Sequence, residues 1–362
     1  MRKTIFLLFL AGCSSAPGTS QLPVNGQAGA PADGKAASPG TGVETITPAD
    51  MRARIAFLAS DELKGRNTPS PGLEKAAEYI AGEFREWGLQ PAGDNGTYIQ
   101  RYPYVPRPRR GAPAPANPDT AYPPNVVAIL PGSDPALRDT YVVFSAHMDH
   151  VGVGQPDARG DSIYNGADDD ASGTSAVLEV AQAMASLPQA QRPKRSMVFL
   201  LVSGEEKGLL GSAWYADHPT VPLEKIVANV NIDMIGRNSP DTVVAIGNEY
   251  SSLGPLVASI AKQRPELGFT VVPDIWPEER FFFRSDHFNF AKKEIPAIFF
   301  FAGVHEDYHR PSDEVETIDT DKATRIARLV YFLADAIGND PNPPKWTPEG
   351  LEAVRALTRQ GR

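Results

Sequence analysis

Short apolar runs along the chain alternate with segments in which apolar residues recur every three or four positions. The runs predict buried strands, and the spaced segments predict amphipathic helices. Because strands and helices alternate, we expect an α/β fold, a three-layer α/β/α sandwich around a central mixed, mainly parallel sheet. The expected strands span residues 125–130, 141–146, 196–202, 226–233, 241–246 and 295–301. The expected helices span residues 171–187, 208–217, 251–264, 285–293 and 320–337.

Two further helices are expected before this alternation. The first begins at Thr47-Pro48, where a capping residue precedes proline at the first helical position, and the second covers residues 73–87. Residues 101–124 are rich in proline and predict a solvated loop. The last stretch, residues 339–362, opens with prolines and closes with a short helix expected at 351–357.

Three consecutive aspartates, Asp168, Asp169 and Asp170, lie just before the helix expected at 171–187. Like charges repel each other, and burying a carboxylate without a counter-charge is costly. A divalent cation would offset both costs, and the dipole of the following helix also favours negative charge at its start. Taken alone, however, the run is equally compatible with a solvated acidic turn.

Three of the predicted strands end in histidine or carboxylate residues, which favours a metal site over a solvated acidic turn. Residues two apart on an extended chain face the same way. Asp149 is therefore expected to orient His147 by bonding to the second nitrogen of the imidazole ring. Sites in parallel sheets lie beyond the carboxyl ends of the strands, and one metal-binding site there is therefore favoured. The residues at the three strand ends are His147 and Asp149, Glu205 and Glu206, and Asp233.

Six short motifs occur along the chain in a fixed order. They are His147-x-Asp149, Gly166-x-x-Asp169-x-x-Ser172-Gly173, Gly204-Glu205-Glu206-x-Gly208-Leu209-x-Gly211-Ser212, Asn231-x-Asp233-Met234-x-Gly236, Arg284-Ser285-Asp286-His287 and Tyr308-His309-x-Pro311-x-Asp313. The set resembles the secreted bacterial double-zinc aminopeptidases, whose superfamily also holds glutaminyl cyclases and glutamate carboxypeptidases. The resemblance covers residues 45–338 and implies that they form a zinc peptidase catalytic domain.

The resemblance implies two zinc ions held by histidine nitrogens and carboxylate oxygens. Two such ions, about 3.5–4 Å apart, can share one hydroxide and clamp the attacking and carbonyl oxygens. Relatives hold the bridging aspartate by a non-proline cis peptide, which predicts such a bond between Asp169 and Asp170. The implied ligands are His147 and Asp233 for one ion, Glu206 and His309 for the other, and Asp169 as the bridge.

The same resemblance gives Glu205 the role of general base, which takes a proton from water and passes it to the leaving amine. Consecutive residues at a strand end diverge, so Glu205 can face water while Glu206 faces metal. Tyr308 is implied to support the oxyanion, and Arg284 to lie near the N-terminus of the substrate. The implied outer-shell partners of the ligands are Asp149 and Asp286.

Three further histidines, His150, His287 and His305, lie near these motifs. Metal sites need only a few ligands, so we expect each of them to be buried with satisfied hydrogen bonds. Trp276 and the phenylalanines at 281–283 are expected to pack in the core. Their proximity to the arginine of the fifth motif leaves a role in a substrate pocket open.

The N-terminus predicts a targeting segment. Arg2 and Lys3 precede a short apolar stretch, so residues 1–12 are expected to form a signal peptide. The following Leu10-Ala11-Gly12-Cys13 resembles a bacterial lipobox, which would make Cys13 a lipid-modified residue; a plain signal peptide is the alternative. Cys13 is the one cysteine, which excludes an internal disulfide. We expect residues 13–44 to be a flexible tether, and the protein to be anchored in the cell envelope, at an outer membrane facing the periplasm or the exterior.

Composition narrows the function classes. Acidic residues outnumber basic ones by 44 to 35, which argues against a nucleic-acid partner. The absence of a Gly-x-Ser-x-Gly motif argues against a serine hydrolase. The leading interpretation is a zinc-dependent exopeptidase that acts on peptides with a free N-terminus. Alternatives are a glutaminyl-peptide cyclotransferase working with one zinc, a carboxypeptidase-like zinc hydrolase, and a binding module with a relic site.

Overall fold

The computed structural model describes residues 41–106 and 119–360. The predicted signal peptide, Cys13 and all but the end of the predicted tether lie outside these residues. The described chain opens with a 3-10 turn at Gly42–Thr45, where the N–H of Gly42 donates a hydrogen bond of 2.8 Å to Ser186 Oγ. The packed structure therefore begins slightly before the predicted boundary at residue 45.

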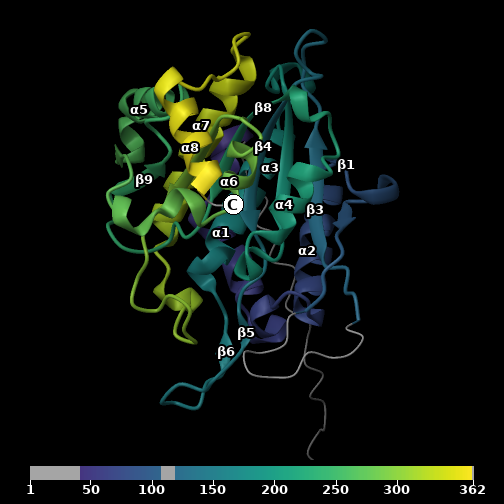
Figure 1. Cartoon of the computed structure of the whole chain (residues 1–362), viewed down its shortest axis with the longest axis vertical. Coiled ribbons are helices and arrows are strands. Elements are labelled where there is room, and N and C mark those ends of the chain that lie inside the picture. Colours follow the sequence, from purple (N-terminus) through teal and green to yellow (C-terminus); the bar gives the residue numbers. More distant parts are fainter. Residues whose placement is uncertain (1–40, 107–118, 361–362) are drawn as a thin grey trace, which may run out of the picture. The chain divides into compact units, whose positions relative to one another are not determined.

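A sheet of nine strands forms the centre of the described chain, in the order β1-β3-β7-β4-β8-β11-β9-β10 with β2 beside β3 (Figure 1). The central strands β7, β4, β8 and β11 are mutually parallel. On one side β3 runs antiparallel to β7, and β1 and β2 each pair antiparallel with β3. On the other side β9 pairs antiparallel with β11. The predicted mixed sheet is thus confirmed, with its parallel strands at the centre. The strands are β1 (Gln90–Pro91), β2 (Ile99–Arg101), β3 (Pro124–Leu130), β4 (Tyr141–His147), β7 (Ser196–Val202), β8 (Ile226–Ile232), β9 (Thr242–Ile246), β10 (Thr270–Val272) and β11 (Ala297–Phe301).

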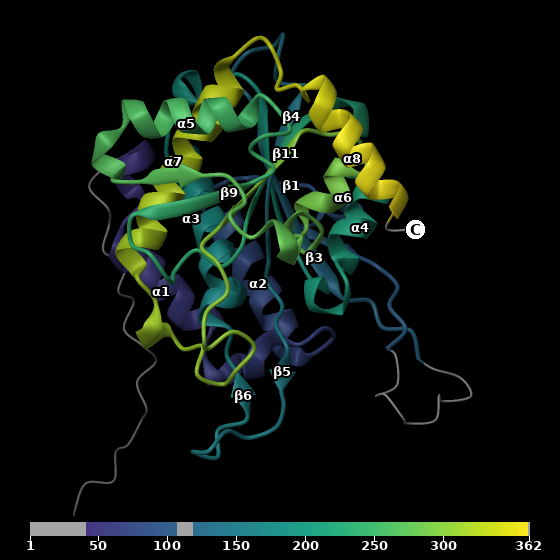
Figure 2. The same ribbon diagram turned by 60° about the vertical axis from the view of Figure 1, so that its left-hand side comes forward.

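Helices cover both faces of the sheet, as Figure 2 shows. Alternate residues of each strand point to opposite faces, so Val142 and Phe144 join one core cluster while Val143 joins another. The first cluster packs under α1 (Pro48–Leu58), α2 (Pro71–Glu86), α3 (Gly173–Ala185), α5 (Leu253–Gln263) and α7 (Thr320–Asn339). The second packs under α4 (Leu210–Asp217) and α6 (His287–Ala291). The predicted three-layer sandwich is therefore confirmed.

The structure departs from the predicted elements mainly at their ends. The helix expected at 285–293 is reduced to α6, and the side chains of Ser285 and Asp286 just before it make hydrogen bonds at the site. The hairpin of β5 (Gly152–Val153) and β6 (Ile163–Tyr164) was not expected, since two-residue strands carry no periodic signal.

The C-terminal segment packs on the domain rather than standing apart as a tail. Its helix α8 (Pro348–Gln360) is longer than expected, and Val354 is buried in a third apolar cluster with Phe282. Trp346 donates a hydrogen bond of 2.7 Å from Nε1 to the carbonyl of Glu294. Within the described ranges, every helix is too short or too polar to cross a membrane.

Candidate metal centre

The five ligands implied by the sequence motifs converge at the carboxyl edge of the parallel strands. His147 ends β4, and Asp233 follows β8 directly. Asp169 lies in the single helical turn of Ala167–Ser172 that leads into α3, Glu206 lies in the turn Glu205–Lys207 after β7, and His309 comes from the loop after β11. All are largely buried except His309, whose side chain is 37% exposed. Connections far apart in sequence therefore meet at one point.

The distances divide the ligands into two sets that share Asp169. On one side, His147 Nε2 lies 3.2 Å from Asp169 Oδ1 and 3.6 Å from Asp233 Oδ1. On the other side, His309 Nε2 lies 3.1 Å from Asp169 Oδ2 and 3.1 Å from Glu206 Oε1. The two carboxylate oxygens of Asp169 thus face different sets, as a bridging ligand requires.

The chemistry of these groups fits zinc. Zinc accepts histidine nitrogen and carboxylate oxygen together. Glu206 Oε1 and His309 Nε2 are both buried, and neither has a hydrogen-bond partner of normal geometry in the described chain. Leaving such atoms unsatisfied is costly, and a cation at the point where they converge would remove that cost.

Asp170 also lies near His147 and Asp233, within a set of three that could hold a metal. Both of its oxygens are already used, however. Oδ1 accepts from the N–H groups of Gly173 (2.8 Å) and Met234 (3.2 Å), and Oδ2 accepts from the N–H of His147 (3.2 Å). Asp170 therefore ties the local backbone together, and Asp169 is the better bridge. The peptide bond between Asp169 and Asp170 is cis, as predicted.

The partners that orient the ligands differ in part from the predicted ones. Asp149 does hold His147, but with its backbone carbonyl oxygen, which lies 3.1 Å from Nδ1, whereas its carboxylate is 3.7 Å away. That carboxylate accepts instead from Thr68 Oγ1 at 2.8 Å and from the N–H of Glu205 at 3.3 Å. The carboxylate of Asp149 therefore connects the segment after β4 to the segment after β7, and it does not polarise the imidazole of His147.

Asp286 is buried, and its carboxylate accepts a hydrogen bond from the hydroxyl of Ser212, not from any proposed ligand or its neighbours. Its neighbour Ser285 holds the ligand instead, donating to Asp233 Oδ2 at 2.8 Å. Ser285 stands in the fifth motif, but no pattern in the sequence distinguishes it from Asp286 as the partner.

Two residues that were not predicted as site residues, although Asp313 stands in the sixth motif, shape the loop that carries Asp169. The carboxylate of Asp313 accepts from the N–H groups of Asp168 (3.0 Å) and Asp169 (3.2 Å). Arg66 is fully buried and donates to the carbonyls of Met148, at 2.9 Å, and Gly166, at 3.0 Å. Burial lowers its pKa to about 10. A buried arginine satisfied by backbone carbonyls belongs to no motif, so sequence reasoning had no signal for it.

The two adjacent glutamates differ in their surroundings. Burial is the largest influence on the pKa of Glu205 and raises it well above its ordinary value. Burial also acts to raise the pKa of Glu206, but contacts with His150 and His309 outweigh it, and the pKa is lowered. Glu206 is therefore favoured as a charged carboxylate, as a ligand must be.

A small cavity opens onto one side of this centre. His147, Asp169, Glu205 and Asp233 form its polar end. Its remaining walls are mostly apolar and aromatic, which suits an apolar side chain of a ligand. They are formed by Met234, Phe281, Phe299, Phe301, Val304, Arg284 and Tyr308.

The two predicted substrate-contacting residues, Arg284 and Tyr308, both line this cavity. Arg284 is half-exposed, lies 3.3 Å from Glu279 and stands over the ring of Phe281. The ring of Tyr308 stacks on His309 with centroids 3.9 Å apart, and burial raises the pKa of its hydroxyl. Phe281 also serves both roles left open for the aromatic cluster, because it packs against Trp276 and faces the cavity.

The remaining histidines do not all behave as predicted. His287 is buried between the rings of Phe282 and Phe299. His305 is buried with Nε2 3.3 Å from Asp168 Oδ2. His150 is fully buried as well, but it faces Glu206 and has no hydrogen-bond partner of normal geometry among the described residues. Both ring nitrogens of all three histidines lack a hydrogen-bond partner of normal geometry among the described residues. Burial of their side chains is therefore confirmed, but the expectation of satisfied hydrogen bonds is wrong for each of them.

Comparisons with known proteins agree with this site. Residues 125–334 match Peptidase family M28, which is more than half of the 362 residues. A probable zinc metalloprotease of Pyrenophora tritici-repentis (strain Pt-1C-BFP) is 24% identical over 354 residues, covering 84% of this chain and 69% of the relative.

Two solved structures illustrate the shared fold. An aminopeptidase from Aneurinibacillus sp. strain AM-1 superimposes with a TM-score of 0.62 at 17% identity, covering 84% of this chain and 96% of that one. Porphyromonas gingivalis glutaminyl cyclase gives 0.60 at 16% identity, covering 80% and 98%. At such identities the likeness establishes the fold alone. With the family match, the fold and the paired ligand sets, the chain is a zinc-dependent, aminopeptidase-like hydrolase and belongs to peptidase family M28.

Proposed function

We propose that the protein is an aminopeptidase that removes N-terminal residues from peptides by means of two zinc ions. The observation that carries this proposal is the cavity, which joins apolar walls to His147, Asp169, Glu205 and Asp233. A substrate placed there would have its terminal side chain against the apolar walls and its first peptide bond beside the ligands and Glu205.

The charges around the cavity support an amino-terminal substrate. Asp169 and Asp233 would be neutralised by the zinc ions, which leaves the carboxylate of Glu205 facing the cavity, where it suits a positively charged terminal amine. A carboxypeptidase would need an available cation for the substrate carboxylate. Arg284 is the one arginine or lysine among the described residues that line the cavity, and it is already paired with Glu279.

The proposed metal ligands are those that the distances divide into two sets. His147 and Asp233 would hold one zinc, Glu206 and His309 the other, and Asp169 would bridge them. Once bound, a zinc pair lowers the pKa of water and polarises the carbonyl that is attacked.

Glu205 is proposed as the general base. It lines the cavity beside His147 and Asp233 but belongs to neither ligand set, so its carboxylate is free to take a proton from water and return it to the leaving amine. Tyr308 is proposed to donate from its hydroxyl to the oxygen that becomes negative during the reaction, which its place on the cavity wall supports. Arg284, at the rim, is proposed to position the substrate near its N-terminus.

We also propose that the protein works in the cell envelope, anchored by lipid through Cys13. The support is the sequence Leu10-Ala11-Gly12-Cys13 after a basic and then apolar start. Residues 13–44 would then serve as a tether that lets the catalytic domain reach peptides near the membrane.

A peptide screen tests the activity. Zinc-loaded protein is incubated with one apolar pentapeptide in three forms: free, N-acetylated and C-amidated. The expected result is stepwise loss of N-terminal residues from the free and C-amidated forms and none from the acetylated form. Loss of C-terminal residues would indicate a carboxypeptidase instead. Cyclisation of a peptide that begins with glutamine, without hydrolysis of the others, would indicate a cyclotransferase.

A further inference from the structure

His150 stands at the metal centre without a role in the proposed mechanism. It follows β4 by three residues and is fully buried. Its Nδ1 lies 2.9 Å from Glu206 Oε1 and 3.6 Å from Asp169 Oδ2. The ring is tightly held, because a Cβ on Gly166, which has a φ of +58°, would lie 2.5 Å from its Cγ. The nitrogen therefore points at the ligands in a fixed orientation.

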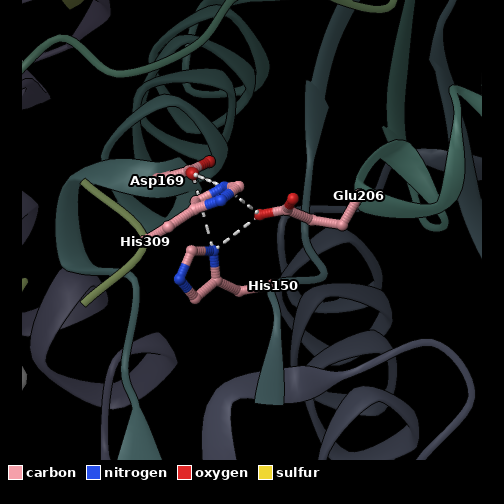
Figure 3. Close-up of side chains that lie close together, drawn as sticks. All are labelled: His150, Asp169, Glu206 and His309. Carbon is pink, nitrogen blue, oxygen red and sulfur yellow. Dashed lines mark ion pairs between the residues drawn. The ribbon is translucent and has the colours of Figure 1, made fainter. Parts of the chain in front are cut away.

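His150, Asp169, Glu206 and His309, together called the His150 group, point toward one another from separate loops (Figure 3). Four of the separations between their ligand atoms are 2.9, 3.6, 3.1 and 3.1 Å. In a tetrahedral zinc site with bonds of about 2.0–2.1 Å, neighbouring ligand atoms lie about 3.3 Å apart. The group therefore has the dimensions of a complete tetrahedral zinc site.

A hydrogen bond from His150 to Glu206 would account for only part of this arrangement. A donor needs one acceptor, whereas Nδ1 lies near oxygens of both Glu206 and Asp169. The same Glu206 oxygen also lies 3.1 Å from His309 Nε2. Two nitrogens and two oxygens that face a common point are what a shared cation requires.

The cavity gives an independent sign that the two sides of the centre differ. Among the described residues that line it are His147, Asp169 and Asp233, here called the His147 group, but not His150, Glu206 or His309. The His147 group thus offers three protein ligands and faces the cavity. The His150 group offers four, and of these only the shared Asp169 lines the cavity.

We propose that His150 is a fourth protein ligand for zinc on the Glu206 and His309 side, so that the two metal sites are unequal. This inference rests on the proposed zinc-dependent function. Four protein ligands are typical of structural zinc sites, whereas three with an open position are typical of catalytic ones. The His150 group accordingly binds the tighter zinc, and the His147 group binds the weaker zinc with its open position toward the substrate.

The variant His150→Asn distinguishes a zinc ligand from a hydrogen-bond donor. Its side-chain amide can replace the Nδ1–H donor, but it is a poor zinc ligand. Zinc affinities of both sites are measured by chelator competition. Loss of an outer-shell partner costs roughly 10–100-fold in affinity, so loss of a direct ligand is expected to weaken the tighter site by more than about 100-fold. The matched variant His147→Asn should weaken the other site and leave the tighter one intact. Two unchanged affinities in His150→Asn would overturn the proposal.

X-ray absorption on wild-type protein loaded with one zinc gives a test that needs no variant. The expected spectrum shows two imidazoles on that zinc, from His150 and His309, and one imidazole would overturn the proposal. Failure here is distinct from failure of the proposed function. Two zinc ions and peptide hydrolysis with a single imidazole would reject only the role of His150. Two imidazoles without hydrolysis of any peptide would reject only the proposed activity.

Discussion

The hydroxyl of Ser285 donates a hydrogen bond of 2.8 Å to Oδ2 of Asp233. The other oxygen of that carboxylate, Oδ1, is the one that lies 3.6 Å from His147 Nε2. Ser285 is itself fixed by Asn231, whose side-chain amide donates to its Oγ at 2.8 Å. Because serine and aspartate are both buried, this bond determines which oxygen is presented to a metal.

We therefore expect Ser285→Ala to weaken zinc binding by the His147 group by about 10–100-fold, the usual effect of losing an outer-shell partner. The zinc held by the His150 group should keep its affinity. Chelator competition measures both. Ser212→Ala is a matched control, since Ser212 is buried but its hydroxyl donates to Asp286 instead. An equal loss in both variants would contradict the assignment and restore Asp286 as a partner of the ligands.

His287 should make the fold sensitive to acid. Burial between two aromatic rings lowers its pKa from 6.5 to about 3, because the charged imidazolium loses its hydration there. Its contribution to stability is therefore complete above pH 6.5 and is lost as the pH falls from 6.5 towards 3. The free energy of unfolding should fall by about 1 kcal/mol per pH unit across that window on account of His287.

His287→Leu should remove this pH-dependent contribution to the free energy of unfolding. Urea unfolding of the zinc-free wild type and variant at several pH values from 7 to 4 measures it as the difference between the two curves. Other histidines contribute to both proteins and cancel in that difference. Curves that stay parallel over the whole range would show that His287 does not carry this acid sensitivity.

The sequence predicts the architecture well where a long apolar pattern carries the signal. The strands ending near His147, Glu205 and Asp233 were placed to within a residue or two, because each is a continuous buried run. Short elements carry no such pattern, and the hairpin of β5 and β6 was missed for that reason. The packing of α8 was missed because it depends on Trp346 and Val354 meeting a surface made by distant residues.

The site shows the same division. The motifs identify His147, Asp169 and Glu206 as metal ligands, because only a few residue types can bind zinc. The role of His150 depends on how far the loop after β4 carries its ring towards Glu206, and no spacing in the sequence encodes that distance. Similarly, Asp149 holds His147 by its backbone carbonyl oxygen. Every residue has such an oxygen, so the sequence gives no sign of this contact.

Cys13→Ser tests the anchor. If Cys13 carries lipid, the variant should be unprocessed or soluble, while the wild type should partition into membranes. Cell fractionation and the mass of the mature protein measure the two outcomes. Because the chain has one cysteine, the substitution disturbs no disulfide. A variant that is still cut and membrane-bound like the wild type would exclude the lipoprotein hypothesis.

Glu205 and Glu206 offer the sharpest test of the mechanism, because they are adjacent and chemically identical. Glu206 Oε1 lies among the atoms of the His150 group, whereas Glu205 lines the cavity. Glu206→Gln should therefore lower bound zinc towards one per chain. Glu205→Gln should keep both zinc ions and substrate binding, but its kcat should fall by roughly 10²–10⁴-fold, the usual contribution of a positioned proton carrier.

The comparison is clean because glutamine has nearly the shape of glutamate, so a loss of packing cannot account for a fall in kcat that leaves zinc content intact. Elemental analysis beside steady-state kinetics gives both readouts on the same samples. If the two carboxylates instead share the metal, the variants should lose zinc equally, and the division of roles is wrong. If Glu205→Gln stays fully active, another group moves the proton. Tyr308 and Asp233, which line the same cavity, would then be the next residues to substitute.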